Sequence, residues 1–414
     1  MDVVFDRVAG LDIGKASVTV CVRTPGEGGK REVQTRTFRT MTRSLTLMAD
    51  WLQECGVELA AMESTATYWN PVFYCLEERM ECWLLNAAHM KAVPGRKTDV
   101  KDAEWIAQLL EHGLVRPSFV PPPQIRRLRN MTRHRVQLQG DRTRDAARLE
   151  KLLEDASIKL SVVASNITGT SARAMLGALV AGERDAAVMA ELAKSRLRRK
   201  IPDLREALTG RFDDHHGLIV GQLLTRLAQT EAALADLDAA IADAMTPWAH
   251  ELELLQTIPG IGLRTAQVFI AETGGDMSRF PTAAHLAAWV GVAPAIHESA
   301  GKRTPAGTRH GNKFLTSMLV EAANSAARSK HTYLAAQHAR IASRRGHNRA
   351  AMAVAHSMLV AAYYMLIRDE PYHDLGPTWL DEHARNQAST RRLVTQLERL
   401  GHTVVLDPEA PPAA

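Results

Sequence analysis

Residues 8–23, with the sequence VAGLDIGKASVTVCVR, decide the fold of the N-terminal part of the chain. Two runs rich in apolar and β-branched residues, Val8–Ile13 and Ser17–Arg23, flank Gly14-Lys15, a combination typical of a β-hairpin. Three further strands are predicted at Glu32–Arg39, Val57–Met62 and Cys82–Asn86. Three strands followed by alternating helices and strands predict a small mixed α/β sheet covered by helices.

Helical patterns lie between and after these strands. The spacing of apolar residues predicts helices around residues 45–52, at Pro71–Arg79 and at Asp99–Glu111. Pro121-Pro122-Pro123 then forms a stiff spacer and predicts a domain boundary. We therefore expect an α/β domain at 1–120, a helical connector at 121–250, a C-terminal domain at 251–370 and a partly flexible extension at 371–414.

The connector is predicted to be almost wholly helical. A long basic helix is expected from Gln124 to about Leu160. Between Leu218 and Met245, apolar residues recur every seven positions, which indicates a coiled-coil hairpin or a dimer seam; they are Val220, Leu227, Leu234 and Ile241. Residues 161–215 carry no motif that predicts a function.

Composition indicates an ordinary globular protein. The chain has 414 residues, of which 46% are hydrophobic and 23% charged. No apolar run approaches the roughly 18 residues of a membrane span, and the N-terminus opens acidic, so we expect a cytoplasmic, nucleoid-associated protein with no membrane partner. The four cysteines lack CxxC spacing, which favours reduced thiols and makes a structural zinc site improbable; they are Cys21, Cys55, Cys75 and Cys82.

Positive charge is concentrated in two segments. Residues 124–151 contain nine Lys/Arg and three acidic residues, and residues 296–349 contain ten Lys/Arg and two acidic residues. The whole chain has a net charge of only +5. Concentrated basic surface on an otherwise acidic chain is typical of a partner with closely spaced phosphates. A solvated charged helix face is the plainer alternative. The predicted nucleic-acid contacts in the first segment are Arg126, Arg127 and Arg133.

Four acidic residues stand where a metal site would form. Asp12 and Glu63 come at the ends of predicted strands, and Asp99 and Asp102 lie three apart at the start of a helix, where they share a face. Carboxylates that converge repel one another unless cations intervene, and oxygen ligands suit Mg²⁺ or Mn²⁺. Paired ions of this kind promote displacement at a phosphodiester. Asp99 and Asp102 could instead simply favour the helix start.

The same first strand also permits a rival prediction. Leu11-Asp12-Ile13-Gly14 is similar to the first phosphate loop of actin-like ATPases. Those proteins continue with a small hydroxyl residue and carry a second Asp-x-Gly and a glycine-rich adenosine loop. Lys15-Ala16 follows here, and no convincing second loop is found, so we prefer the metal site.

The C-terminal domain contains two motifs that suggest nucleic-acid chemistry. Residues 257–266, TIPGIGLRTA, have the pattern of a helix-hairpin-helix, in which glycines and the free N–H groups at a helix start hold a phosphate. This predicts DNA contacts at Gly260, Gly262 and Arg264, although the hairpin could instead pack on protein. Ser299 lies among glycines and small residues and is flanked by cations, so it could attack a phosphate, or could be a simple turn serine; the cations are Lys302, Arg303, Arg309 and Lys313.

Taken together, these motifs resemble one family closely. The acidic set, the hairpin 258–262, the stretch 286–294 (LAAWVGVAP), the run 299–303 (SAGKR) and the block 311–315 (GNKFL) resemble the DEDD transposases of bacterial insertion sequences, the group that includes the Piv DNA invertase. The resemblance implies an RNase H-like, RuvC-like N-terminal domain whose Asp12, Glu63, Asp99 and Asp102 bind Mg²⁺, and a C-terminal domain whose Ser299 becomes joined to DNA. The family usually carries glycine directly after this serine, where Ala300 stands here.

The resemblance also implies partners. It implies double-stranded DNA at the element ends and target, a structured guide RNA encoded by the element, and a homo-oligomer, either a dimer or a tetramer. We therefore predict a site-specific DNA recombinase that works through a serine–DNA intermediate. The alternatives are a RuvC-like metal nuclease that uses activated water, and a non-catalytic architectural DNA binder, for which four converging acids would be a liability.

Overall fold

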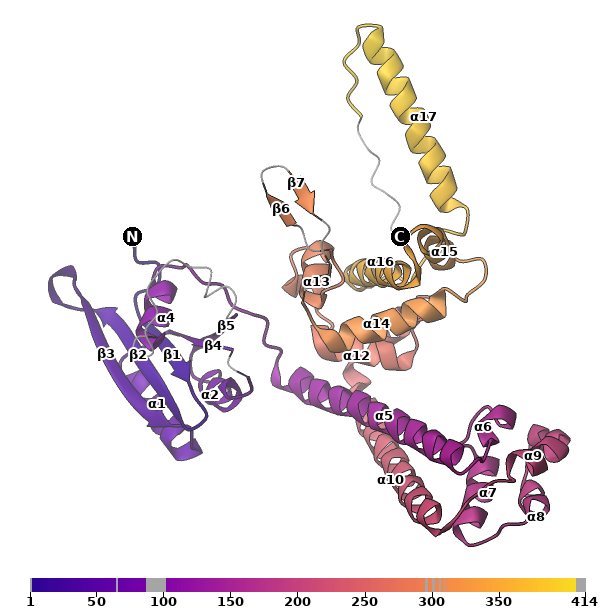
Figure 1. Cartoon of the computed structure of the whole chain (residues 1–414). Helices are drawn as coiled ribbons and strands as arrows, with labels where there is room; N and C mark the ends of the chain where they lie inside the picture. Colours follow the sequence, from indigo (N-terminus) through magenta and orange to yellow (C-terminus); the bar gives the residue numbers. More distant parts are fainter. Residues whose placement is uncertain are drawn as a thin grey trace. The chain divides into compact units, whose positions relative to one another are not determined.

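The computed structural model describes residues 2–64, 66–86, 102–294, 297–299, 302–304, 307–308 and 310–406. It divides into two compact units, Met1–Val120 and Pro121–Ala414, which are considered separately (Figure 1). This boundary coincides with the predicted one at the proline run. The finer predicted divisions at 250 and 370 stay predictions.

The N-terminal unit is built on one five-stranded sheet. Its strands have the order β3-β2-β1-β4-β5, with β1, β2 and β3 antiparallel and with β4 and β5 parallel to β1. The strands are β1 (Val8–Ile13), β2 (Ser17–Pro25), β3 (Arg31–Arg39), β4 (Leu59–Glu63) and β5 (Glu81–Leu85), and the helices are α1 (Thr42–Glu54), α2 (Trp69–Leu76) and α4 (Asp102–Glu111). The predicted mixed sheet is confirmed.

Helices cover both faces of this sheet because its strands are apolar on both faces. Ala9, Leu11 and Ile13 of β1 point into a core formed with α1 and α2. The alternate residue Val8 packs on the opposite face against Leu109 and its neighbours in α4. Each face of β1 therefore has its own helical cover.

The C-terminal unit is mostly helical, as predicted. Its helices are α5 (Pro123–Asp155), α6 (Leu160–Val163), α7 (Thr170–Val180), α8 (Ala186–Ala190), α9 (Ile201–Ala207), α10 (Asp214–Ala244), α11 (Ala249–Gln256), α12 (Leu263–Thr273), α13 (Ala283–Val290), α14 (Lys313–Ala326), α15 (Tyr333–Arg345), α16 (His347–Arg368) and α17 (Trp379–Arg399). Two short strands, β6 (His297–Ser299) and β7 (Lys302–Thr304), form a hairpin between α13 and α14.

The two longest helices, α5 and α10, run antiparallel and lie side by side (Figure 1). Ion pairs join the two helices along their length. The residue numbers on α5 rise while those of the partners on α10 fall, as expected for antiparallel helices. The pairs are Arg135–Asp238 at 2.5 Å, Arg142–Glu231 at 2.9 Å and Asp145–Arg226 at 3.1 Å. At the next level Nε2 of His216 lies 3.2 Å from the carboxylate of Asp155. The apolar residues predicted to recur every seven positions are all buried within this unit; they are Val220, Leu227, Leu234 and Ile241.

Residues 156–213, for which the sequence predicted no function, form a small core of their own. The helices α6, α7, α8 and α9 pack there against the C-terminal end of α5 and the N-terminal end of α10. The basic helix ends at Asp155, earlier than the expected Leu160. The reason is local: Ser157 takes a left-handed φ of 59°, and Arg211 donates its backbone N–H to the carbonyl of Ala156.

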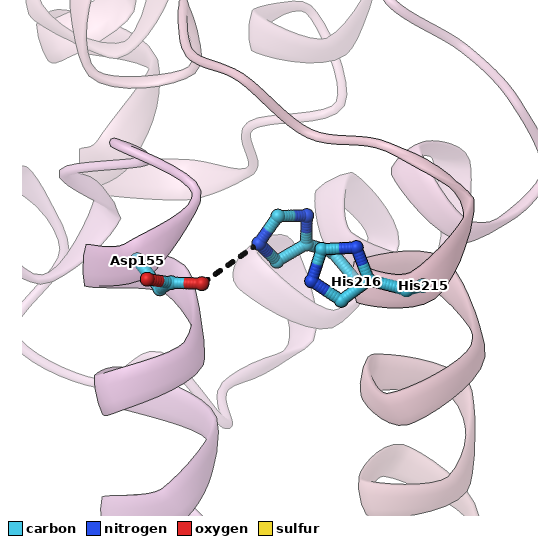
Figure 2. A group of neighbouring side chains, drawn as sticks. All are labelled: Asp155, His215 and His216. Atoms are coloured by element: carbon cyan, nitrogen blue, oxygen red, sulfur yellow. Dashed lines mark hydrogen bonds and ion pairs between the residues drawn. The ribbon is translucent and has the colours of Figure 1, made fainter.

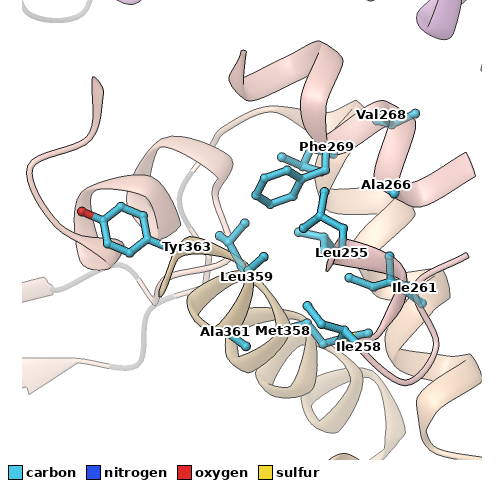
Figure 3. Packing of buried hydrophobic residues seen from close by; sticks show 14 of the residues in the cluster. Leu255, Ile258, Ile261, Ala266, Val268, Phe269, Met358, Leu359, Ala361 and Tyr363 are labelled. Carbon is cyan, nitrogen blue, oxygen red and sulfur yellow. The ribbon is translucent and has the colours of Figure 1, made fainter. Parts of the chain in front are cut away.

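A second core joins α11–α16 to the start of α5 and the end of α10. Figure 3 shows part of it, where Leu255, Ile258 and Phe269 of the α11–α12 hairpin face Met358 and Leu359 of α16. Among the described helices α16 is the one long and apolar enough to span a membrane, but over half of its apolar window is buried inside this unit. Its apolarity is that of a core helix.

Candidate functional site

Asp12 and Glu63 lie next to each other at the C-terminal ends of adjacent parallel strands. The register pairs Leu11 with Met62, so the next step along both strands brings Asp12 beside Glu63. Neighbouring strands are about 4.8 Å apart. Asp12 follows Val8 and Gly10 at two-residue spacing, and Glu63 likewise follows Leu59 and Ala61, so both acids are on the face that α4 covers. Both are half-buried.

The helix α4 brings Asp102 to the same corner. It runs antiparallel to β1, because Leu109 and Leu110 pack near the start of that strand while Ala103 lies over Gly10. A methyl group on Gly10 would lie 2.3 Å from the backbone oxygen of Ala103, so only glycine permits this approach. Asp102, the first residue of α4, is therefore held over the strand ends, and its own side chain is half-buried.

Two arginines fix the other end of α4. The side chain of Glu111 is only 1% exposed. It forms ion pairs with Arg23 of β2, at 2.7 Å, and with Arg31 of β3. This buried carboxylate is thus neutralised within the unit, so it is part of the scaffold. Asp99, the fourth predicted acid, lies outside the described residues. The structure brings together three of the four predicted acids.

Ser299 lies on a hairpin strand rather than in an irregular loop. It closes β6 and pairs with Lys302 of β7, while Glu298 pairs with Arg303 and His297 with Thr304. The side chains of both strands lie outside what is described, as does the whole of Arg309. Ser299 and the acids belong to different compact units.

The base of this hairpin is held by the motifs on either side of it. A bridge between Pro294 and Thr308 joins its two ends. Gly311 lies so close to the end of α13 that an added methyl group would be 2.3 Å from the carbonyl oxygen of Val290. Thr316 of α14 donates to that same carbonyl at 2.8 Å. The stretches 286–294 and 311–315 therefore form one packed support for the hairpin.

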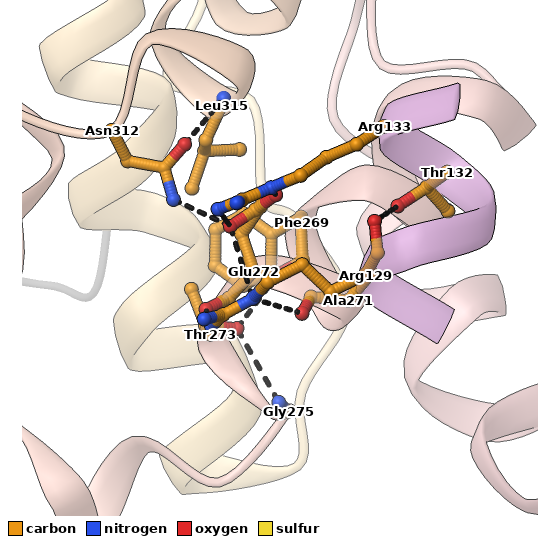
Figure 4. A network of polar contacts seen from close by, with 10 residues as sticks. All are labelled: Arg129, Thr132, Arg133, Phe269, Ala271, Glu272, Thr273, Gly275, Asn312 and Leu315. Carbon is orange, nitrogen blue, oxygen red and sulfur yellow. Dashed lines mark hydrogen bonds and ion pairs between the residues drawn. The ribbon is translucent and has the colours of Figure 1, made fainter. Parts of the chain in front are cut away.

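A buried carboxylate, Glu272 of α12, ties this support to α5. Figure 4 shows Arg133 and Asn312 converging on it, and Arg133 donates to both of its oxygens, at 2.7 and 2.8 Å. Arg129 forms an ion pair with it at 3.2 Å, and Asn312, which caps α14, donates to it at 2.6 Å. Glu272 is fully buried. No sequence pattern marked it, because its partners are about 40 and 140 positions away.

The predicted nucleic-acid contacts differ in what surrounds them. Arg133 is engaged with Glu272, and Arg264 pairs with Asp238 at 2.5 Å. Gly260 has φ 93° and packs on α14, where a methyl group would lie 2.3 Å from the carbonyl oxygen of Ala322, so this part of the α11–α12 hairpin docks on protein. Gly262, Arg127 and Lys313 are exposed and Arg126 is half-buried.

A large cavity opens beside the base of the serine hairpin. Its volume is about 1060 Å³, and Pro294 and Thr308 line it together with Arg345, Asn348, Arg349, Met352 and His356. Burial lowers the pKa of His356 below its ordinary value, so this imidazole is neutral at pH 7. Two guanidinium groups beside apolar walls suit a ligand that has both a phosphate and an apolar ring.

Two family models match the chain, and residues 159–251 lie between the two matched parts. A model described as "Transposase" matches residues 9–158, and one described as "Transposase IS116/IS110/IS902 family" matches residues 252–339. A solved RuvC structure from Thermus thermophilus covers 27% of this chain and 99% of its own at 13% identity, with a TM-score of 0.22. That score is too low to add to the fold described above.

Curated relatives come from insertion elements. The transposase for insertion sequence element IS1111A of Coxiella burnetii is 28% identical over 162 residues, which is 37% of this chain and 43% of that protein. An insertion element IS110 protein of Streptomyces coelicolor is 34% identical over 30% of this chain and 31% of its own. An insertion element IS900 protein of Mycobacterium paratuberculosis is 29% identical over 49% and 54%.

These matches span only about a third to a half of each relative's length. The two family models nevertheless follow each other in chain order and contain the residues of the acidic corner and of the serine hairpin. The chain belongs to the IS110 family of insertion-sequence transposases.

Proposed function

We propose that the chain is a DNA transposase that cleaves and rejoins DNA at the ends of its element, with the acidic corner as its metal site. The observation that carries this proposal is the meeting of Asp12, Glu63 and the first turn of α4 at one edge of the sheet. Asp99 lies three positions before Asp102, so it would share the face of an extended α4. All four groups offer carboxylate oxygens, which fit Mg²⁺ or Mn²⁺.

Asp12, Glu63, Asp99 and Asp102 would hold the ions, which when bound would supply positive charge at the scissile phosphate. The chain's own part is positioning. The sheet register fixes the spacing of Asp12 and Glu63, and the contact at Gly10 fixes the height of Asp102 above them. A site built on rigid elements in this way keeps its ligands in place before DNA arrives.

We further propose that Ser299 is the nucleophile. Its Oγ forms a bond to phosphorus, one bridging P–O bond breaks, and the serine proton ends on the departing hydroxyl, so a phosphoester is retained for rejoining. Lys302, Arg303, Arg309 and Lys313 would neutralise the phosphate charge near this serine. The backbone register, which pairs Ser299 with Lys302, supports this proposal because a lysine stands directly opposite the serine in the hairpin.

The proposed partners are double-stranded DNA, a structured guide RNA and further copies of the chain. The cavity beside the serine hairpin, with Arg345 and Arg349 on its wall, supports a phosphate-bearing ligand in that region. The exposed residues Arg127 and Lys313 stay candidate contacts. RNA recovered from the purified protein, and loss of recombination after its digestion, would test the guide.

Labelled DNA tests the serine. With Mg²⁺, the unmodified chain should form a covalent adduct that survives denaturation and maps by peptide analysis to Ser299. Ser299→Ala should bind DNA but form neither adduct nor recombinant. Cleavage without an adduct would favour the water-using nuclease, and a crosslink on Thr304 or on the exposed Ser317 would move the nucleophile.

Paired inactive variants test the assembly. Asp12→Asn and Glu63→Gln remove metal-binding charge at nearly constant shape, so each should abolish cleavage and leave the fold intact. If acids and serine from different copies form one site, mixing Asp12→Asn with Ser299→Ala should restore part of the activity. A mixture as inactive as its components would argue that each copy works alone.

A further inference from the structure

A cluster of histidine and aspartate side chains lies where the end of α5 meets the start of α10, in the C-terminal unit. Figure 2 shows Asp155, the last residue of α5, facing the rings of His215 and His216 in the first turn of α10. One ligand atom from each of these three side chains lies within 4.8 Å of the other two. Asp155 and His215 are exposed, whereas His216 is 5% exposed.

Asp213 orients both rings. It caps α10, and one of its carboxylate oxygens lies 2.5 Å from Nδ1 of His215 and 2.9 Å from Nδ1 of His216. The backbone N–H of Asp213 also points at Nδ1 of His216 as a donor, in the manner of a capping box, but at the longer distance of 3.3 Å. If both Nδ1 atoms carry hydrogen and donate to Asp213, both Nε2 atoms are left with lone pairs. A carboxylate that receives the far N–H of a histidine is the usual neighbour of a metal-binding imidazole.

The lone pair on Nε2 of His216 then faces a second carboxylate. Oδ2 of Asp155 lies 3.2 Å from it, and two acceptors at that distance repel each other unless a positive charge stands between them. Two ligands each about 2.0–2.1 Å from a tetrahedral zinc ion are about 3.3 Å apart. The observed separation therefore fits one edge of such a site.

The electrostatic surroundings also favour a cation. The negative C-terminal end of the α5 dipole meets the positive N-terminal end of α10, so the two dipoles largely cancel and the carboxylates set the local charge. Asp155, Asp213 and Asp214 are three carboxylates gathered around the rings of His215 and His216. A divalent ion would offset two of these three negative charges.

We propose that Asp155, His215 and His216 bind a zinc ion, oriented by Asp213, that ties the end of α5 to the start of α10. Nitrogen and oxygen donors of this kind, three from protein with a water as the fourth, suit Zn²⁺. The ion would link the two points at which the chain enters and leaves the small core formed by residues 156–213, the end of α5 and the start of α10. Cysteine spacing made a structural zinc site improbable from sequence, and this set of ligands was missed because its two parts are 60 positions apart.

The test uses the full chain without a polyhistidine tag, stripped with chelator, in the Asp12→Asn, Glu63→Gln background so that the acidic corner does not compete. Competition with a chromophoric chelator should give one Zn²⁺ per chain, and Co²⁺ should show the visible bands of a tetrahedral site. Hydrogen exchange should slow on adding Zn²⁺ in the last turn of α5 and the first turn of α10. Zinc that binds without this protection would overturn the proposed tie.

Single substitutions identify the ligands. Asp155→Asn and His215→Ala change exposed side chains, so the fold should persist while zinc affinity falls at least about tenfold. The matched control is His250→Ala, which removes an exposed histidine 2.5 Å from Asp369 that belongs to no such three-residue group among the described residues. Unchanged zinc affinity in both cluster variants, or an equal loss of affinity in the control, would overturn the proposal. The absence of zinc binding would overturn it too, and a proton shared between the side chains would then explain their short distances.

Discussion

Replacing Glu272 by glutamine tests whether one buried carboxylate joins three parts of the C-terminal unit. Glu272 has no exposed surface, and it receives Arg129 and Arg133 from α5 and Asn312 from the start of α14. The substitution keeps the shape of the side chain but removes its charge. Two guanidinium groups, with side chains 15% and 36% exposed, then face a neutral amide.

The expected cost follows from this burial. Breaking a buried ion pair by neutralising one partner costs about 3–5 kcal/mol, because the remaining charge stays desolvated. Glutamine can still accept one hydrogen bond through its amide oxygen, so we expect a loss near the lower limit, about 3 kcal/mol. At an m-value of about 3 kcal/mol per M, the urea midpoint should fall by about 1 M.

Hydrogen exchange in urea, read on peptides of α12 and the start of α14, isolates this unit from the N-terminal one. The matched control is Asp141→Asn in α5, which removes a pair with Arg144 whose side chains are 44% and 61% exposed. Exposed pairs contribute about 0–1 kcal/mol, so the control midpoint should hardly move. Equal shifts in the two variants would refute the structural role assigned to Glu272.

Three further predictions rest on other contacts. Gly10→Ala should destabilise the N-terminal unit by about 3 kcal/mol and weaken Mg²⁺-dependent cleavage, because the new methyl group meets the backbone of α4. The control is Gly177→Ala, where an added methyl group meets no atom within 4 Å, so its thermal unfolding should show no loss of stability. Equal unfolding temperatures of the two variants would contradict the close packing at Gly10. Arg345→Glu with Arg349→Glu should make the negative slope of log affinity for DNA against log salt less steep by about 2. Arg135→Gln, whose side chain pairs with Asp238, should leave this slope unchanged. Burial, with smaller effects from nearby glutamates, raises the pKa of the Cys82 thiol to about 12. Its alkylation by iodoacetamide, followed by mass spectrometry, should therefore be very slow at pH 8 and rise about tenfold per pH unit. A rate that levels off near pH 9 would contradict this pKa.

Local patterns were sufficient to predict the N-terminal unit. The strand Val8–Ile13 was predicted with its observed bounds, and β4 and β5 begin or end within two residues of their predicted limits. Alternation and β-branched residues specify strands through short-range contacts. The acids Asp12 and Glu63 could be placed at strand ends for the same reason.

Long-range contacts could not be predicted in this way. Glu272 appears in sequence as one acid near the end of a helix, and only the fold shows that Arg129, Arg133 and Asn312 converge on it. The helix α17 lies in the extension predicted to be partly flexible. Gly260 was predicted to contact DNA, whereas its packing on α14 depends on residues about 60 positions away.

The basic segment at 124–151 shows why charge counted along a sequence overstates a nucleic-acid surface. Six of its nine cationic side chains pair with acids inside the C-terminal unit; they are Arg129, Arg133, Arg135, Arg142, Arg144 and Arg148. These six charges are paired within the unit, so α5 offers fewer cations to a phosphate than the count along the sequence suggests. In the proposed function we therefore expect phosphate contacts mainly from the second segment, where Arg345 and Arg349 line the cavity beside the serine hairpin. We expect the strongest attraction for DNA next to the proposed nucleophile, because cations already held in internal pairs displace few counterions from DNA.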